Sequence, residues 1–281
     1  MTADDYIFGD VFAAGIVTLE LLTDGLHPFQ GSRDILTMHN MEVGDRSTLL
    51  TSLIDEKARN LVWAMTQSNP EDRLGMEQAR DSPYFQEDGE HIKTVIALNE
   101  ELIQMDEAQE ETKTLKKELE DSFFMLFESD WRKLPFVVPE ILSKSRYSSS
   151  VACFLRYCRN MLVHCREHQE VLRKYFERSL KEVEVLGVIL EHVPRFIVHW
   201  LWFAGRFLPD LLASQGAHFP MACVKAYEQQ MEVSKEKLGT EKLAQLRQQM
   251  AEASEEAFPH LDSMQDAFKR SHQVCQIGAR V

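Results

Sequence analysis

The sequence has little glycine and little proline: 12 glycines and 9 prolines among 281 residues. All-β sandwiches and barrels need more turn residues, so this shortage counts against them and favours a mostly helical protein. An even set of paired cysteines is also lacking, because the five present are an odd number without paired spacing. We therefore expect a protein of a reducing compartment and not a disulfide scaffold. Residues 1–5 are acidic where a signal peptide would be basic.

Positive charge is scarce as well. There are 31 Lys and Arg residues against 45 Asp and Glu, which gives a formal net charge of −14. A surface of this sign repels phosphate, so we expect no DNA wrapped around the protein. The most apolar run, residues 196–204, is too short for a bilayer and contains His199. We therefore expect a cytoplasmic protein with no membrane segment in this chain.

Helical patterns are what the sequence does contain, and they predict an all-α fold. Residues 11–22 are almost entirely apolar, which is typical of a buried helix. A second helix is expected to begin at Asp55, which would be its N-cap residue, and to end at Asn69-Pro70. Its apolar face has the spacing i, i+3, i+4 and i+7: Ala58, Leu61, Val62 and Met65.

Composition divides the chain into three parts, with boundaries at 1–87, 88–207 and 208–281. The first has mixed composition and several loop signals. The second opens with an acidic amphipathic helix over 88–122, interrupted near 108–112, and ends with the apolar stretch 183–207 as the centre of its core. The third is a Gln-, Glu-, Lys- and Ala-rich tail for which a helical hairpin is expected.

The sign of the charge reverses between Asp130 and Lys181, where eleven Lys and Arg stand against five Asp and Glu. Two interpretations stay open. The basic segment binds an anionic partner, or its basic face meets the acidic helix that precedes it.

Several motifs in the first part resemble the C-terminal lobe of a eukaryotic protein kinase. They are Asp10-Val-Phe-Ala-Ala-Gly15, Glu20-Leu-Leu, His27-Pro28-Phe29, Asn69-Pro-Glu-Asp-Arg73 and Ser82-Pro-Tyr-Phe85. The Gly-rich loop, the Val-Ala-Ile-Lys strand and the His-Arg-Asp and Asp-Phe-Gly motifs are missing, so kinase activity is not expected. Asp10 and Arg73 would lose the partners that this family provides, at a cost of about 3–5 kcal/mol for a buried charge.

The second part resembles the kinase-extension nuclease (KEN) family, which includes ribonuclease L and the inositol-requiring stress kinase/endoribonuclease. The resemblance covers roughly 10–205 and depends on Asp130-Trp131-Arg132, Tyr147, Arg159-Asn160, His164, Pro194 and His199. It implies a helical endoribonuclease that cleaves single-stranded or loop RNA without a metal or cofactor and leaves a 2′,3′-cyclic phosphate. It further implies a homodimer and a role in RNA processing during stress.

The resemblance also implies roles for individual residues. His164 would protonate the leaving 5′-oxygen, and Tyr147 would act on the 2′-hydroxyl with a cation, Arg146 or Arg159, beside it. Arg159 and Asn160 would hold the phosphate. The candidate RNA-binding residues are Arg146, Arg156 and Arg195. The stress endoribonuclease commonly has an Arg two places before the residue that matches Pro194; this sequence has His192 there, and either His192 or Arg195 would substitute for that Arg.

Other hypotheses remain beside this one. The chief alternative is a catalytically silent pseudokinase–KEN module that binds RNA or a protein partner. His164-Cys-Arg-Glu-His168 also fits an inverted zincin pattern, with Glu167 as base, although we expect no metal site. Cys158 and Cys165 are expected in the core, and Trp200 and Trp202 in packing rather than base stacking. His199 is expected to be a hydrogen-bonded structural histidine.

Overall fold

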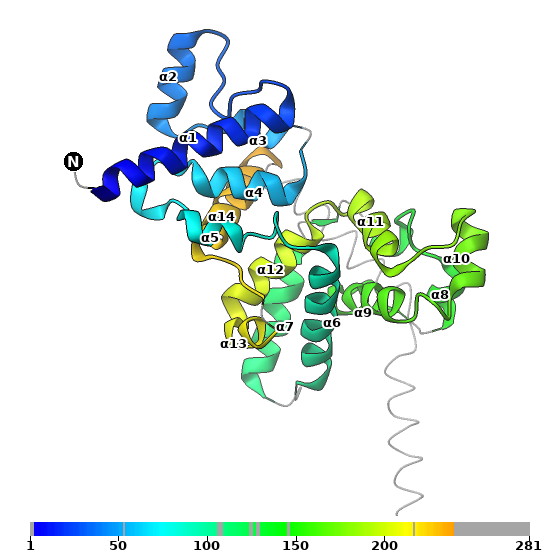
Figure 1. Cartoon of the computed structure of the whole chain (residues 1–281). Coiled ribbons are helices and arrows are strands. Elements are labelled where there is room, and N and C mark those ends of the chain that lie inside the picture. Colours follow the sequence, from blue (N-terminus) through cyan, green and yellow to red (C-terminus); the bar gives the residue numbers. More distant parts are fainter. Residues whose placement is uncertain are drawn as a thin grey trace, which may run out of the picture.

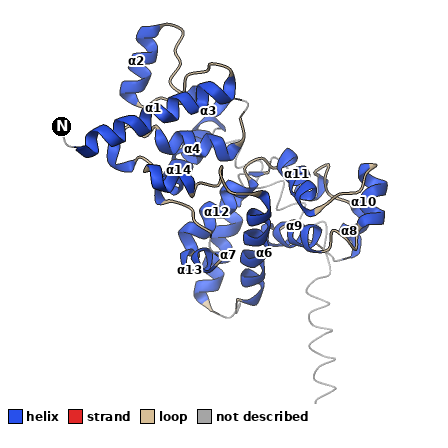
Figure 2. Cartoon of the chain, viewed as in Figure 1, coloured by secondary structure: helices blue, strands red, loops and turns tan. Residues whose placement is uncertain are grey.

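The computed structural model describes residues 3–238, except for 53, 106–108, 124–125, 128–129, 145–146 and 216. Every regular element in these described ranges is a helix, and none is a strand (Figure 2), which confirms the all-α prediction. Arg146 and most of the expected tail, from 239 onward, lie outside the described residues.

The helices gather in three groups, which Figure 1 shows. The first holds α1 (Ala3–Thr23), α2 (Asp34–Val43), α3 (Ser47–Thr51), α4 (Glu56–Met65) and α5 (Met76–Arg80). The central group holds α6 (Asp88–Gln104), α7 (Glu110–Phe123), α12 (Phe196–Phe207) and α13 (Pro209–Ser214). The third holds α8 (Pro139–Lys144), α9 (Val151–Val163), α10 (Gln169–Phe176) and α11 (Glu182–His192). The chain then returns to the first group as α14 (Met221–Leu238).

Helix α4 begins where the sequence predicts. The Asp55 carboxylate accepts hydrogen bonds from the backbone N–H groups of Lys57 and Ala58, as an N-cap residue should. Burial extends beyond the predicted apolar face, because α1, α12 and α14 all pack against this helix. Even Asn60 is buried, and its Nδ2 donates to the Cys223 carbonyl at 3.1 Å.

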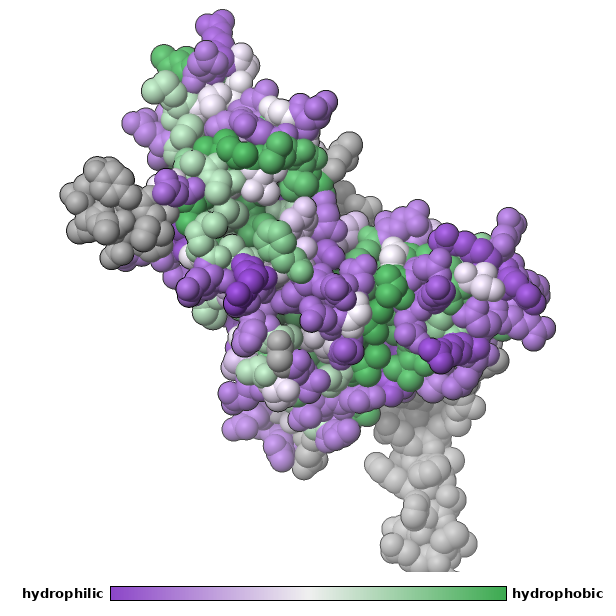
Figure 3. All heavy atoms as spheres, viewed as in Figure 1, coloured by the Kyte–Doolittle hydropathy of each residue, from purple (hydrophilic) through white to green (hydrophobic). Residues whose placement is uncertain are grey.

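Helix α1 forms as predicted, but the expectation that it is buried is wrong. Val11 and Leu19 face α4 and are fully buried, whereas Leu21 is 80% exposed and Val17 is 51% exposed. Apolar residues around the whole helix cannot all be covered when its neighbours pack on one side. Figure 3 shows this part of the surface as largely hydrophobic.

Contrary to expectation, neither Asp10 nor Arg73 is a buried charge without a partner. Asp10 is exposed, so water solvates its carboxylate. Arg73 donates from Nε to the Gln67 carbonyl at 2.7 Å and from Nη2 to the Ser68 carbonyl at 3.3 Å. Its guanidinium also lies 4.7 Å from the centre of the Phe12 ring. Backbone carbonyls and an aromatic face replace the carboxylate that the kinase family would provide.

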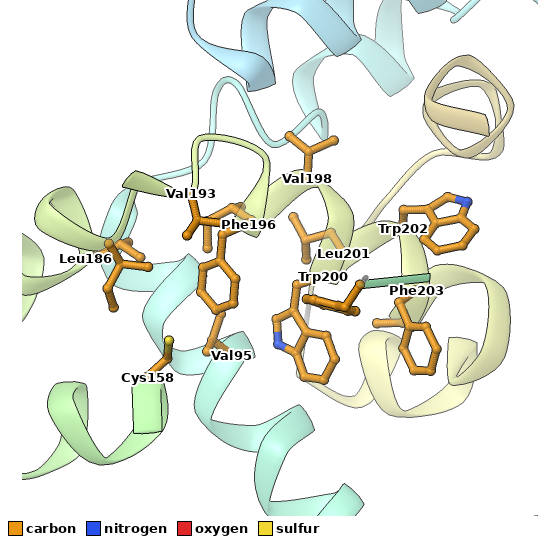
Figure 4. Close-up of a cluster of buried hydrophobic side chains, with 14 of the residues drawn as sticks. Val95, Cys158, Leu186, Val193, Phe196, Val198, Trp200, Leu201, Trp202 and Phe203 are labelled. Carbon is orange, nitrogen blue, oxygen red and sulfur yellow. The ribbon is translucent and has the colours of Figure 1, made fainter. Parts of the chain in front are cut away.

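The core continues through α12, which contributes the aromatic cluster drawn in Figure 4. Phe196, Trp200 and Phe203 are fully buried, and Trp202 is nearly so, which confirms packing as their role. His199 is completely buried among them and is hydrogen-bonded through Nδ1 to the Tyr227 hydroxyl at 3.1 Å. The structural role predicted for this histidine is confirmed.

Acidic helices α6 and α7 are separated between residues 105 and 109, close to the predicted interruption. Helix α14, in the segment expected as a tail, packs on α4 and α12. Trp63 Nε1 donates to Gln229 Oε1 at 3.0 Å, and Lys225 Nζ pairs with Asp72 at 2.6 Å.

No single described helix has the length and apolarity to cross a membrane; α11 and α12 meet that test only as a pair, bent by 94°.

Candidate functional site

The candidate site is built along α9, whose beginning is held by another helix. Ser150 caps the helix, its Oγ accepting from the Cys153 N–H at 3.3 Å. Glu120 of α7 accepts from the N–H groups of Val151 at 2.8 Å and Ala152 at 3.2 Å. A carboxylate at this position is favourable for the helix dipole, although burial raises the pKa of Glu120. The predicted apolar stripe is buried: Val151, Phe154, Leu155, Cys158, Leu162 and Cys165.

Tyr147 and Asn160 meet on one side of α9. Tyr147 precedes the helix and is 4% exposed, with its ring packed edge-on against Trp131 and Tyr157. Asn160 Nδ2 donates to the Tyr147 hydroxyl at 2.8 Å. The amide therefore orients the phenol oxygen, and two of the four predicted catalytic residues are in direct contact.

Two arginines complete this cluster. Arg159 Nη1 donates to Asn160 Oδ1 at 3.1 Å, so the Asn160 amide bridges Arg159 and Tyr147. The Arg156 guanidinium lies over the Tyr147 ring, 4.8 Å from its centre. A cation over the face of a phenol stabilises negative charge on it. Of the described arginines, Arg156 therefore lies over the ring, whereas Arg159 reaches the phenol oxygen through Asn160.

Glu100 of α6 belongs to the cluster too, and the sequence analysis did not single it out. Arg159 Nη2 donates to Glu100 Oε1 at 2.6 Å, which holds the guanidinium in place. The pair joins the basic segment to the acidic helix, as the second interpretation of the charge reversal predicts. By contrast, Arg166 and Lys174 have side chains 90% and 81% exposed, with carboxylates no nearer than 3.7 and 3.8 Å.

His164 lies one helical turn beyond Asn160 but makes a different contact. Its backbone N–H donates to the Asn160 carbonyl at 2.9 Å, which ends α9. Its side chain is 37% exposed, and Nδ1 donates to Glu167 Oε1 at 3.0 Å. That hydrogen bond lowers the pKa of Glu167. In the described part of the chain, the His164 imidazole has no hydrogen bond with Tyr147, Arg159 or Asn160.

Arg195 lies away from this cluster. Its Nε is 3.5 Å from Glu56 Oε1, and its Nη1 is 3.4 Å from Ser234 Oγ, so it connects α4 with α14. His192, which stands where the resembled family commonly has an arginine, stacks on the Phe136 ring, with ring centres 6.0 Å apart. We refer below to Tyr147, Arg156, Arg159, Asn160 and His164 as the α9 site.

The cysteines and histidines near the site do not form a ligand set. Cys158 and Cys165 are buried as predicted, and burial raises the pKa of both thiols. Among the residues that the structure describes, no group of three or more His, Cys, Asp or Glu side chains could hold a metal ion. His164 and His168 have ring centres 6.3 Å apart.

Comparison with protein families finds no family model that matches this sequence, and comparison with curated proteins finds none that is similar.

Proposed function

We propose that this protein binds single-stranded or loop RNA at the α9 site and cleaves it without a metal ion, leaving a 2′,3′-cyclic phosphate. The observation that carries the proposal is the hydrogen bond from Asn160 to the Tyr147 hydroxyl, flanked by two guanidinium groups. Guanidinium groups bind phosphate, and RNA supplies its own nucleophile, the 2′-hydroxyl. The kinase-like first part carries no phosphoryl-transfer motifs, so we propose no kinase activity.

The proposed reaction is a transesterification within the RNA. The ribose 2′-oxygen attacks the adjacent phosphorus and gives its proton to the phenolate oxygen of Tyr147. The bond from phosphorus to the 5′-oxygen breaks, and the imidazolium of His164 donates a proton to that oxygen. Arg159 and Asn160 stabilise the added negative charge on the phosphate, and the Arg156 cation over the ring stabilises the phenolate.

His164 has to exchange its contact with Glu167 for the substrate in this mechanism. The side chain is partly exposed, and the pair it forms is at the surface, where such pairs contribute little. Turning the imidazole toward the phosphate is therefore inexpensive, and Asn160 is only one helical turn away.

The first test is cleavage of a fluorescent single-stranded RNA by the full chain in EDTA. We expect His164→Ala to lower the rate at least about 100-fold, because a positioned general acid contributes that much. His168→Ala is the matched control, since it removes the same side chain one turn further along and should leave the rate unchanged. A rate that rises steeply with protein concentration would support a homodimer. Equal rates for wild type and His164→Ala would contradict the proposal.

A second candidate is an RNA-binding module without catalysis. It is favoured by the burial of Tyr147 and by the contact of His164 with Glu167 rather than with the other members of the α9 site. RNA that binds the full chain, loses affinity on Arg156→Ala and is never cleaved would select this function.

A further inference from the structure

A small cavity adjoins the α9 site and is lined by two cationic side chains. It lies between α6, α7 and α9 and has a volume of about 220 Å³. Lys116 of α7 and Arg156 of α9 both line it, and both residues are partly buried. The Arg156 guanidinium also lies over the Tyr147 ring, so whatever fills the cavity is a direct neighbour of the α9 site.

The charges in the cavity wall have one sign. Apart from the two cations, the described lining residues are uncharged and mostly apolar: Asn99, Leu102, Ile103, Leu119, Ala152, Cys153 and Leu155. The whole chain, in comparison, has a formal net charge of −14, and the larger cavity beside Phe207 is lined by Glu110, Glu111 and Glu118. Apolar walls around charges of one sign focus their field and raise the local concentration of counter-ions, which here are anions.

Two carboxylates near the cavity are engaged elsewhere. Glu120 is not among the lining residues, and its two oxygens accept hydrogen bonds from the N–H groups of Val151 and Ala152 at 2.8 and 3.2 Å. Its charge is therefore directed at the beginning of α9, where the helix dipole offsets it. Glu100 pairs with Arg159 at 2.6 Å and does not line the cavity either. The cavity itself consequently favours an anion.

We propose that this cavity binds a second phosphate of the RNA, one nucleotide away from the phosphate that is cleaved at the α9 site. The inference rests on the proposed function. The Lys116 ammonium and one edge of the Arg156 guanidinium would hold the phosphate oxygens, and the aliphatic side chains would contact the adjoining ribose carbons. The volume equals that of about seven liquid water molecules, which admits a phosphate group with part of its ribose rather than a whole nucleotide.

The proposal predicts that a substrate with two phosphates is cleaved better than a substrate with one. A dinucleoside monophosphate, NpN, carries only the phosphate that is cleaved, whereas pNpN and NpNp carry a second phosphate on the 5′ or the 3′ side. All three would be offered to the full chain in EDTA, below saturation and as mixtures of the four bases. Either pNpN or NpNp should be cleaved at least about tenfold faster than NpN, because a hydrogen bond to a charged group contributes about that factor.

Lys116→Gln should bring this rate ratio close to one, because it removes one of the two cations from the cavity wall. Lys117→Gln is the matched control: it removes the neighbouring, exposed lysine of the same helix, which does not line the cavity, and should leave the ratio intact. A structural role of Lys116 would lower both rates equally and leave the ratio unchanged, which would contradict the proposal. If Lys116→Gln does not fold, Ala152→Phe fills the cavity from an exposed position and should bring the ratio close to one as well.

Cys153 provides a readout that does not depend on cleavage. It lines the cavity as a partly buried free thiol, whereas the other described cysteines are buried. Inorganic phosphate should slow its alkylation by iodoacetamide, an uncharged reagent, about fivefold at four times the Kd of phosphate, and chloride at the same ionic strength should not. Protection of Lys116→Gln should need about tenfold more phosphate, and protection of Lys117→Gln should need as much as the wild type.

The two proposals fail in different ways. If RNA is cleaved but neither pNpN nor NpNp is cleaved faster than NpN, the second phosphate site is overturned while the cleavage proposal stands. If pNpN or NpNp protects Cys153 better than NpN does, and no RNA is ever cleaved, the phosphate site stands and catalysis is overturned. Protection by inorganic phosphate with no gain from the second RNA phosphate would identify a site for a free anion, and would overturn the inference about RNA.

Discussion

At the scale of single residues, two buried ionisable side chains, Arg46 and His199, stand out. Arg46 is 6% exposed, and no carboxylate among the described residues accepts a hydrogen bond from it; its Nε donates to the Thr66 carbonyl at 3.1 Å. Its guanidinium also lies 5.4 Å from the ring centres of Phe29 and Trp63. Burial lowers the pKa of Arg46 to about 10 and that of His199 to about 3. His199 is consequently neutral in the folded protein near pH 7.

A pH dependence of stability follows from His199. Its folded pKa of about 3 lies below the ordinary value of 6.5, so the unfolded chain binds more protons between these two pH values. Stability therefore falls as pH is lowered through this window, by about 2 kcal/mol between pH 7 and pH 5 from this group alone.

His199→Gln removes the titration while leaving a polar group beside Tyr227. Urea unfolding at pH 7 and pH 5 should show the wild type losing about 2 kcal/mol more than the variant over this interval. His218→Gln, at an exposed position, should behave as the wild type does. Equal pH dependence in wild type and His199→Gln would show that the buried histidine does not control it.

At the scale of elements, contacts from other helices cap the beginning of α9 and decide which face of α1 is buried. The period of α9 predicts its buried stripe correctly, yet nothing in that period indicates that Glu120, 31 residues before Val151, holds its beginning. The composition of α1 predicts the helix but overstates its burial, because the apolar pattern runs around the helix and only one face has a neighbour.

The cap from Glu120 should be measurable. Glu120→Ala removes the acceptor for two N–H groups at the start of α9 and should lower the free energy of unfolding by about 1–2 kcal/mol. Glu118→Ala removes an exposed carboxylate from the same helix and should change it by less than about 0.5 kcal/mol. Urea unfolding of both variants at pH 7 makes the comparison; similar losses would mean that the cap contributes nothing.

Helix α14 connects the first and central groups of helices, which matters at the scale of the whole molecule. Asn60 and Trp63 of α4 both donate hydrogen bonds to it, and Tyr227 on its other side contacts His199 of α12. Arg195 adds a link between Glu56 and Ser234. Segments more than 150 residues apart in the sequence are therefore joined, and we expect them to unfold together.

Tyr227→Ala tests this coupling. Tyr227 is 1% exposed, so removing its ring leaves a cavity that should cost about 3–5 kcal/mol. Because α14 packs on both groups, hydrogen exchange should accelerate in α4 and in α12 alike. Met221→Ala, on the same helix and 61% exposed, is the control and should accelerate neither. Faster exchange confined to α12 would show that the two groups unfold independently.

The sequence by itself determined the fold class and many local features: the Asp55 cap, the interruption between α6 and α7, the stripe of α9 and the core aromatics of α12. These features depend on residues within a few turns of one another, so period, caps and breakers are enough to predict them. Tyr147 and Asn160 are grouped by the family resemblance and not by a helical period, and the two are hydrogen-bonded.

Only the tertiary structure decided which faces are covered and which distant polar groups pair. Glu100 joins Arg159 across 59 residues, and Arg73 is satisfied by backbone carbonyls rather than left without a partner. The physical reason is that a helix period specifies an apolar face but not the neighbour that covers it. Likewise, a buried polar group is stabilised by whichever donor or acceptor the packing of the helices brings near it. The local sequence does not predict which group that is.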